Sequence, residues 1–140
     1  MAAQKVSDPI APRLDADDYQ KTSYTFMPCN DPRIIYQGET LVRDDHVIVS
    51  GGDWKIDFAV PASAREVLPI LNRHDWSGVV ELSWGQNHVT HDLYSWFPYV
   101  QPVRISAGPA APAAPVSITC AGRNPSSFAS QCVVFGALFR

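Results

Sequence analysis

The sequence has 140 residues, of which 46% are hydrophobic and 18% charged, with 12 prolines and a formal net charge of −3. This is enough apolar material for the core of one domain, and the many prolines favour loops and edge strands over long helices. The 11 Lys and Arg residues are scattered with no two adjacent, so we expect no binding to nucleic acid. No segment resembles a signal peptide or is apolar enough for membrane insertion, so the expected location is the cytoplasm or a virion.

The amino-terminal segment, residues 1–20, is the first expected element. It contains four aspartates, two basic residues and two prolines, and few large apolar side chains. Such a segment cannot bury enough surface to fold alone. We therefore expect an extended arm that either stays flexible or lies along a partner.

Residues 21–106 have the pattern of a β-domain. A first hairpin is expected from two apolar runs, 40–50 and 54–60, separated by Gly51-Gly52-Asp53. Residues 61–68 resemble a short helix, because Ser63 and Glu66 have the spacing of a capping box, and Pro69 would end it. A second hairpin is expected from 79–84 and 88–96, and an edge strand from the proline-containing segment 99–106.

The last part of the chain begins with an Ala/Pro-rich linker or loop, 107–116. Residues 117–140 are predicted to form a carboxy-terminal β-hairpin that completes the sheet or pairs with a neighbouring subunit. The second case would make this end an assembly segment, with its contacts at Val133, Phe135, Leu138 and Phe139.

The count is seven to nine short strands and one short helix. This predicts an all-β fold, an antiparallel β-sandwich, with a jelly-roll-like arrangement or a squat barrel as the alternative. The three cysteines, Cys29, Cys120 and Cys132, are expected to be reduced and packed as small apolar residues. A disulfide between Cys120 and Cys132 across the terminal hairpin is the alternative.

No motif in the sequence supports catalysis or a cofactor. The closest pair of histidines, His88 and His91, would point to opposite faces of a strand, and a metal site would need a third ligand such as His46. The adjacent pairs Asp45-His46 and His74-Asp75 lack the context of a nucleophile. We therefore expect no enzyme, no cofactor and no metal.

The aromatic residues are the stronger indication of function, apart from Trp54 and Trp84, which lie on alternating apolar faces and are expected in the core. Trp76, Trp96 and Tyr99 lie near turns or prolines, where an exposed ring could stack on a sugar or fill a pocket in a protein partner. Partial burial under a loop is the alternative. The polar neighbours that could contact the same ligand are Asn87, His88 and Asp92.

The layout of an arm, a compact domain and a tethered apolar end predicts a non-enzymatic structural subunit of a larger assembly. Its partners would be other protein subunits, as in a capsid, decoration or tail component of a virus or phage. The alternative is a carbohydrate-binding, lectin-like module, in which a glycan is the partner. A weaker alternative is a small metal-dependent enzyme built on His46, His88 and His91.

Overall fold

The computed structural model describes residues 23–107 and 114–140, which form an all-β antiparallel fold. The predicted arm and most of the Ala/Pro-rich segment lie outside the described residues. Ten strands occur in the order β1 (Thr25–Pro28), β2 (Ile34–Val42), β3 (Val47–Phe58), β4 (Glu66–Arg73), β5 (Val79–Trp84), β6 (Asn87–Asp92), β7 (Tyr99–Pro102), β8 (Ile105–Ser106), β9 (Val116–Gly122) and β10 (Cys132–Phe139).

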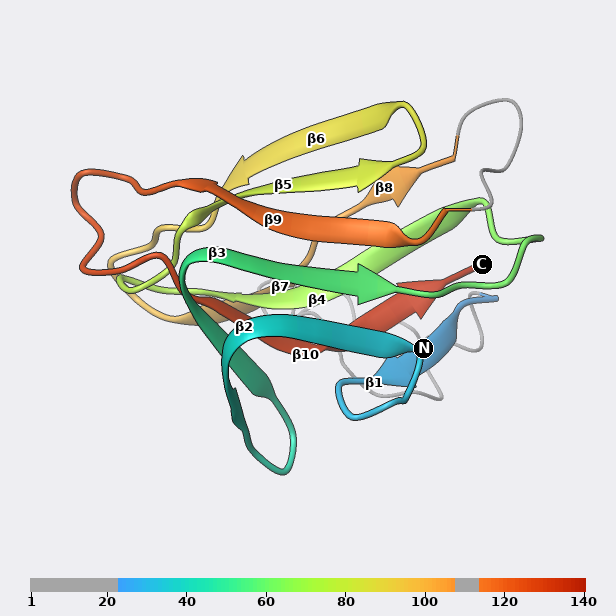
Figure 1. Cartoon of the computed structure of the whole chain (residues 1–140), viewed down its shortest axis with the longest axis horizontal. Coiled ribbons are helices and arrows are strands. Elements are labelled where there is room, and N and C mark those ends of the chain that lie inside the picture. The colour runs from blue at the N-terminus through green and yellow to red at the C-terminus, as the bar shows by residue number, and fades with distance from the viewer. Residues whose placement is uncertain (1–22, 108–113) are drawn as a thin grey trace, which may run out of the picture.

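The strands belong to one connected sheet with the order β6-β5-β9-β3-β10-β4-β7, and β1, β2 and β8 pair with β10, β3 and β4 respectively. The sheet is curled, so that β5 and β9 lie across from β4, β7 and β10 (Figure 1). The prediction of an all-β antiparallel fold is confirmed. Among the described residues, no helix is long and apolar enough to cross a membrane.

Strand β3 joins the two sides of this curled sheet. Its first residues pair with β10, from Val47 to Val49, and its last residues pair with β9, from Lys55 to Phe58. Because one strand changes partner along its length, the sheet turns back over its own face. The residues at this change are 51–53, which are exposed and begin with two glycines.

The first predicted hairpin is therefore wrong in its position. Gly51 and Gly52 lie inside β3, and the true hairpin joins β2 to β3 through Asp44 and Asp45. The Arg43 N–H donates to the His46 carbonyl at 2.9 Å and closes this turn. Aspartate is as good a turn former as glycine, and only the pairing of both strands selects between the two sites.

The predicted short helix is also wrong, because the described part of the chain contains no helix and Glu66 begins β4. Val67 and Leu71 are both completely buried on the same side of this strand. Pro69, which cannot donate in a strand, lies between the residues that pair with β8 and those that pair with β7. Burial in the sheet thus overrides the local capping signal.

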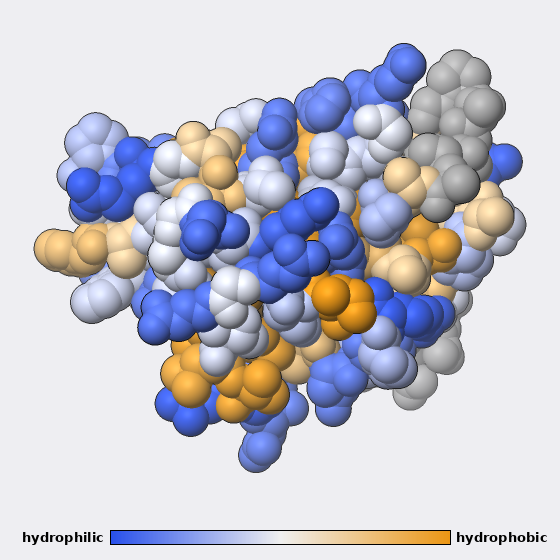
Figure 2. All heavy atoms as spheres, in the orientation of Figure 1, coloured by the Kyte–Doolittle hydropathy of each residue, from blue (hydrophilic) through white to orange (hydrophobic). Residues whose placement is uncertain are grey.

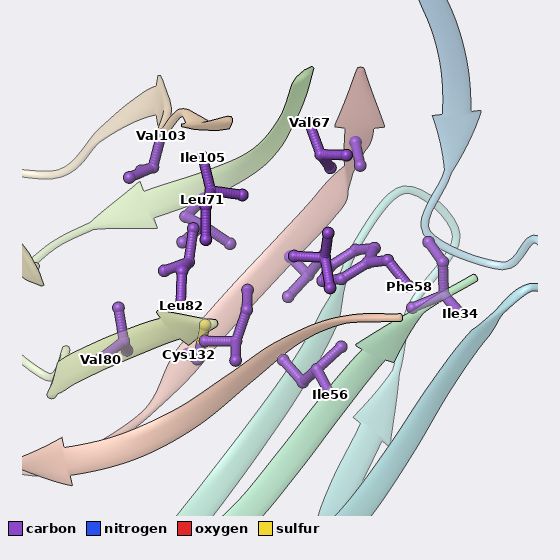
Figure 3. Close-up of a cluster of buried hydrophobic side chains, with 14 of the residues drawn as sticks. Ile34, Ile56, Phe58, Val67, Leu71, Val80, Leu82, Val103, Ile105 and Cys132 are labelled. Atoms are coloured by element: carbon purple, nitrogen blue, oxygen red, sulfur yellow. The ribbon is translucent and has the colours of Figure 1, made fainter. Parts of the chain in front are cut away.

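The core fills the space inside the curled sheet. Figure 3 shows side chains from both sides meeting there, including Ile56 and Phe58 of β3, Leu82 of β5 and Leu71 of β4. Full burial of each such side chain stabilises the fold by about 1.5–3 kcal/mol. Trp54 and Trp84 were expected in the core, and both are buried.

The carboxy-terminal strands find their partners inside the chain. β10 pairs with β3 and β1 on one edge and with β4 on the other, while β9 pairs with β3 and β5. The hairpin expected over 117–140 is therefore wrong, because β3 lies between these two strands.

The four residues of the predicted assembly segment lie on β10. Val133, Leu138 and Phe139 are buried, and Phe135 occupies a register shift against β4, with its ring 5.5 Å from that of His46. Val133, Leu138 and Phe139 could reach a neighbouring subunit only if β10 left the sheet, whereas Phe135 is half-buried.

The second predicted hairpin and the predicted edge strand are found in the structure with shorter bounds. β5 and β6 form the second hairpin, with Trp84 opposite Asn87 across the two-residue turn Gly85-Gln86. β7, which contains Pro102, lies at an end of the strand order, as expected for an edge strand. The candidate disulfide is not formed, because Cys29, Cys120 and Cys132 are all free thiols.

Candidate binding surface at one end of the sheet

Three loops meet at one end of the curled sheet, at the left of Figure 1. They connect β4 to β5, β6 to β7, and β9 to β10. Backbone hydrogen bonds join them: the Ser95 N–H donates to the His74 carbonyl, the Phe128 N–H to the Asp75 carbonyl, and the Gln131 N–H to the Trp76 carbonyl. These lengths are 3.2, 2.8 and 2.9 Å. These backbone hydrogen bonds thus fix the three loops relative to one another.

Ser127 fixes the centre of this loop cluster. Its buried hydroxyl lies 2.7 Å from the Ser77 carbonyl oxygen, which is its nearest acceptor, and 3.1 Å from that of Asp75. The indole N–H of the buried Trp54 donates to the Ser130 carbonyl at 2.8 Å. The loop between β9 and β10 is therefore attached both to its neighbour and to the core.

Five exposed aromatic side chains lie at this end, four of them in the loops and Tyr99 at the start of β7. The exposed fractions are 78% for Trp96, 69% for Phe128 and 48% for Trp76, and Phe97 and Tyr99 are also exposed. We call these five residues the aromatic end. Trp96 meets Phe97 edge to face at 4.9 Å between ring centroids, and Phe97 stacks on Tyr99 at 5.3 Å. Trp76 and Phe128 form a second pair at 6.1 Å.

Polar groups flank the aromatic end. The Arg73 guanidinium lies 5.7 Å from the centroid of the Tyr99 ring and donates to the Asp92 carbonyl at 2.6 Å. The Asp92 carboxylate is exposed, and its Oδ2 accepts a 2.6 Å bond from the Asn124 side chain. The Arg73 guanidinium thus borders the Tyr99 ring, and hydrogen bonds link it to Asp92 and, through Asp92, to Asn124.

His74 lies beneath this surface. Its Nδ1 is 2.5 Å from the Ser77 hydroxyl. Burial lowers the pKa of His74, while a hydrogen bond to Gln131 and the nearby Asp75 act in the opposite direction and only partly offset it. The imidazole is therefore more readily neutral in the folded chain than in the unfolded one.

The predicted contact residues divide into two groups. Trp76, Trp96, Tyr99 and Asp92 gather at the aromatic end, where the three aromatic residues are exposed rather than covered by a loop. Asn87 and His88 lie at the other end of β6. There they line a shallow pocket together with Arg104 and Ser106, and His88 Nδ1 is 3.6 Å from Glu81.

Sequence reasoning missed four members of the site: Phe97, Phe128, Arg73 and Asn124. Phe97 follows Trp96 directly, and Phe128 is the sole aromatic in a loop rich in serine, so both carried a signal in the sequence. Arg73 and Asn124 carried no such signal. Their positions beside Asp92 depend on segments that are far apart in the chain.

The metal alternative gains no support from the described residues, in which no group of three His, Cys, Asp or Glu side chains could hold a metal ion. His88 is exposed and His91 half-buried, on opposite faces of β6. Burial, assisted by Arg73, lowers the pKa of His91.

No model of a known protein family matches the chain, and no curated protein matches it. Among solved structures, the chain is similar to the catalytic domain of a variant GH87 alpha-1,3-glucanase in complex with tetrasaccharides, with 11% identity and a TM-score of 0.49. The match covers 83% of this chain and 27% of that one.

This comparison corrects one prediction. The solved structure is a catalytic domain, which contradicts our expectation that the chain is no enzyme, and that expectation is withdrawn. The likeness assigns no activity to this chain either, because one fold carries many functions and the active residues decide between them.

Proposed function

We propose that the aromatic end binds a carbohydrate. The observation that carries the proposal is the exposed ladder of Trp96, Phe97 and Tyr99, with the guanidinium of Arg73 beside the Tyr99 ring and Asp92 hydrogen-bonded to that guanidinium through its backbone carbonyl. A pyranose ring has an apolar face of C–H groups and a rim of hydroxyls. A flat aromatic ring next to charged hydrogen-bonding groups matches both parts.

The exposure of these rings is costly unless a ligand covers them. Large aromatic side chains gain much of their stabilising effect from burial, and clustered exposed apolar groups in folded domains mark interaction sites. Trp96 leaves 78% of its surface in water although it lies beside two other rings. Binding would remove this surface from water without any change in the core.

The polar groups are also suited to hydroxyl recognition. Asp92 accepts from the Tyr94 N–H through Oδ1 and from Asn124 through Oδ2, so its carboxylate is held in one orientation. Each carboxylate oxygen can accept more than one hydrogen bond. Asp92 therefore keeps acceptor capacity for a sugar hydroxyl while its position is fixed in advance, which reduces the entropic cost of binding.

The test is a screen of the full chain against a panel of glycans, followed by calorimetric titration of the best ligand. We expect Trp96→Ala to weaken binding about tenfold, which corresponds to the loss of about 1.4 kcal/mol. Trp96→Phe should retain most of the affinity because it keeps an aromatic face. Asp92→Asn should weaken binding with the fold unchanged.

The matched control is Ile35→Ala, which removes an exposed apolar side chain from β2, away from the aromatic end. It should leave the affinity as it is. Failure of every glycan to bind, or equal affinity of Trp96→Ala and the unchanged chain, would contradict the proposal.

Tryptophan fluorescence gives an independent readout. Trp54 and Trp84 are buried, whereas Trp76 and Trp96 are exposed, so acrylamide should quench one part of the emission and spare the other. In the Trp76→Phe variant, the part of the emission that acrylamide quenches should come from Trp96. A bound sugar should protect that part from quenching.

A second candidate is a subunit of a larger assembly. It is supported by a separate observation, the exposed apolar side chains of β2, which include Ile35, Leu41 and Val42. Exposed apolar side chains of this kind are typically buried at subunit interfaces. That the assembly is a virion remains a prediction, and copurification of the chain with its assembly partners would test it.

For the architecture, we propose a sandwich rather than a closed barrel. The support comes from the strand order, which begins at β6 and ends at β7, with no ladder between those two strands among the described residues. The two terminal edges remain open.

A further inference from the structure

The outer edge of β2 is an unoccupied strand edge. β2 pairs with β3 on one side, and no strand of the described ranges, 23–107 and 114–140, pairs with its other side. The hairpin of β2 and β3 extends away from the body of the protein (Figure 1). Free strand edges readily pair with another chain unless charges, proline or a covering segment prevent it.

The residues at the tip of this edge are exposed on both faces of the hairpin. Glu39, Thr40 and Arg43 are exposed, and so are the apolar side chains of Leu41 and Val42, at 46% and 63%. Figure 2 shows a hydrophobic patch along the projecting hairpin, with hydrophilic residues beyond it at the tip. The edge therefore combines free backbone groups with apolar surface.

The turn determines which backbone groups are free. Arg43 and His46 form the hydrogen-bonded pair that closes the turn, since the Arg43 N–H donates to the His46 carbonyl. Hydrogen-bonded and non-hydrogen-bonded pairs alternate along an antiparallel ladder, and the register from Val42 to Glu39 is unbroken. The N–H and C=O groups of Thr40 and Val42 therefore point outward.

We propose that two copies of this chain associate by pairing their β2 edges antiparallel, with Leu41 of one copy opposite Leu41 of the other. In this register Thr40 pairs with Val42 of the second copy, and both residues have their free backbone groups at the shared edge. Glu39 then lies opposite Arg43 of the second copy. Two-fold symmetry makes the Thr40–Val42 and Glu39–Arg43 contacts twice, and the Leu41 pair lies on the axis.

Charge selects this register over its neighbours. Only registers that pair Thr40 and Val42 with each other or with themselves use the free backbone groups. If Thr40 lay opposite Thr40, Glu39 would face Leu41. If Val42 lay opposite Val42, Glu39 would face Asp45, and like charges opposite each other destabilise a sheet.

The pairing with Leu41 at the centre is thus the register that places opposite charges across from each other. Glu39 and Arg43 are not neighbours within one copy, because they are four residues apart on an extended strand. Their complementarity is therefore available to a partner. The β2 edge is separate from the aromatic end, so this inference does not depend on the proposed function.

The expected association is weak, because a contact of one strand edge on each side is smaller than a standard interface of about 1,600 Å². The experiment is sedimentation equilibrium of the full-length chain from micromolar to millimolar concentration. We expect a reversible monomer–dimer equilibrium. A mass that stays monomeric across this range would overturn the proposal.

Charge reversal tests the register. Glu39→Arg and Arg43→Glu each place two like-charged pairs across the edge, so each should raise the dimer dissociation constant about tenfold or more. The double variant, with both substitutions, restores opposite charges in this register and should dimerise like the unchanged chain. Arg43→Glu is the stricter single variant, because Glu39→Arg would also place opposite charges across from each other at Asp45 in the register that pairs Val42 with Val42. All these positions are exposed, so the fold is retained.

The control is Arg65→Glu, the same charge change at an exposed position before β4. It should leave the dissociation constant unchanged. If the double variant dimerises no better than the single ones, or if Arg65→Glu weakens the dimer equally, the β2 register is refuted.

Discussion

Gly136 is the position where one methyl group should do most damage. It lies in β10 opposite Pro28 of β1, and its φ angle is +144°. A Cβ added there would be 2.4 Å from the Met27 carbonyl oxygen and 3.0 Å from the Phe26 ring. The carbonyl belongs to the backbone and cannot rotate away, so Gly136→Ala requires β1 to move.

Two other glycines distinguish backbone strain from steric overlap as causes of the lost stability. Gly122 has a φ angle of +142° with nothing within 4 Å of an added Cβ, so Gly122→Ala measures backbone strain, about 1–3 kcal/mol. Gly52 has neither a positive φ angle nor a near neighbour, so Gly52→Ala should change stability by less than about 1 kcal/mol.

Gly136→Ala adds displacement of β1 to this strain. Met27, the completely buried side chain of β1, contributes about 1.5–3 kcal/mol by its burial. The sum predicts a loss of about 2.5–6 kcal/mol of unfolding free energy. For a chain of 140 residues this lowers the melting temperature by roughly 8–18 °C.

The assay is urea unfolding of the three variants, followed by the fluorescence of the buried Trp54 and Trp84. The expected order of destabilisation is Gly136→Ala, then Gly122→Ala, then Gly52→Ala. Equal stability of Gly136→Ala and Gly122→Ala would refute the close approach of β1 to β10.

Two further predictions concern titratable groups. In the native chain a thiol reagent should modify Cys120, which is partly exposed, and should spare Cys29 and Cys132, because both are buried and burial raises the pKa of their thiols. All three thiols should react after unfolding. A single reactive thiol in the unfolded chain would indicate a disulfide. The lowered pKa of His74 means that the unfolded chain binds more protons below about pH 6.5, so stability should fall as the pH drops from about 7 to 5. His74→Gln should flatten this dependence in urea unfolding, and an unchanged slope would contradict the assignment. The remaining slope should come from His91, whose pKa is also lowered.

The candidate site shows where reading the sequence reached its limit. Trp96 and Tyr99 could be found because they lie near turns or prolines, whereas Phe97 between them was missed. The grouping of Asp92 with Arg73 and Asn124 could not be found, because it depends on hydrogen bonds between residues 19 and 32 positions apart in the chain. Asn87 and His88 were placed with Asp92 because they are near it in sequence, but β6 separates them along its length.

The sequence by itself determined the all-β class, the hairpin of β5 and β6, and the buried positions of Trp54 and Trp84. These follow from alternating side chains and short turns, which are properties of neighbouring residues. The tertiary structure alone decided that β3 changes partner at Gly51 and Gly52, that Glu66 begins a strand, and that β10 lies between β3 and β4. Each of these outcomes depends on which distant strand supplies the hydrogen bonds and the apolar contacts, and local sequence contains no record of that choice.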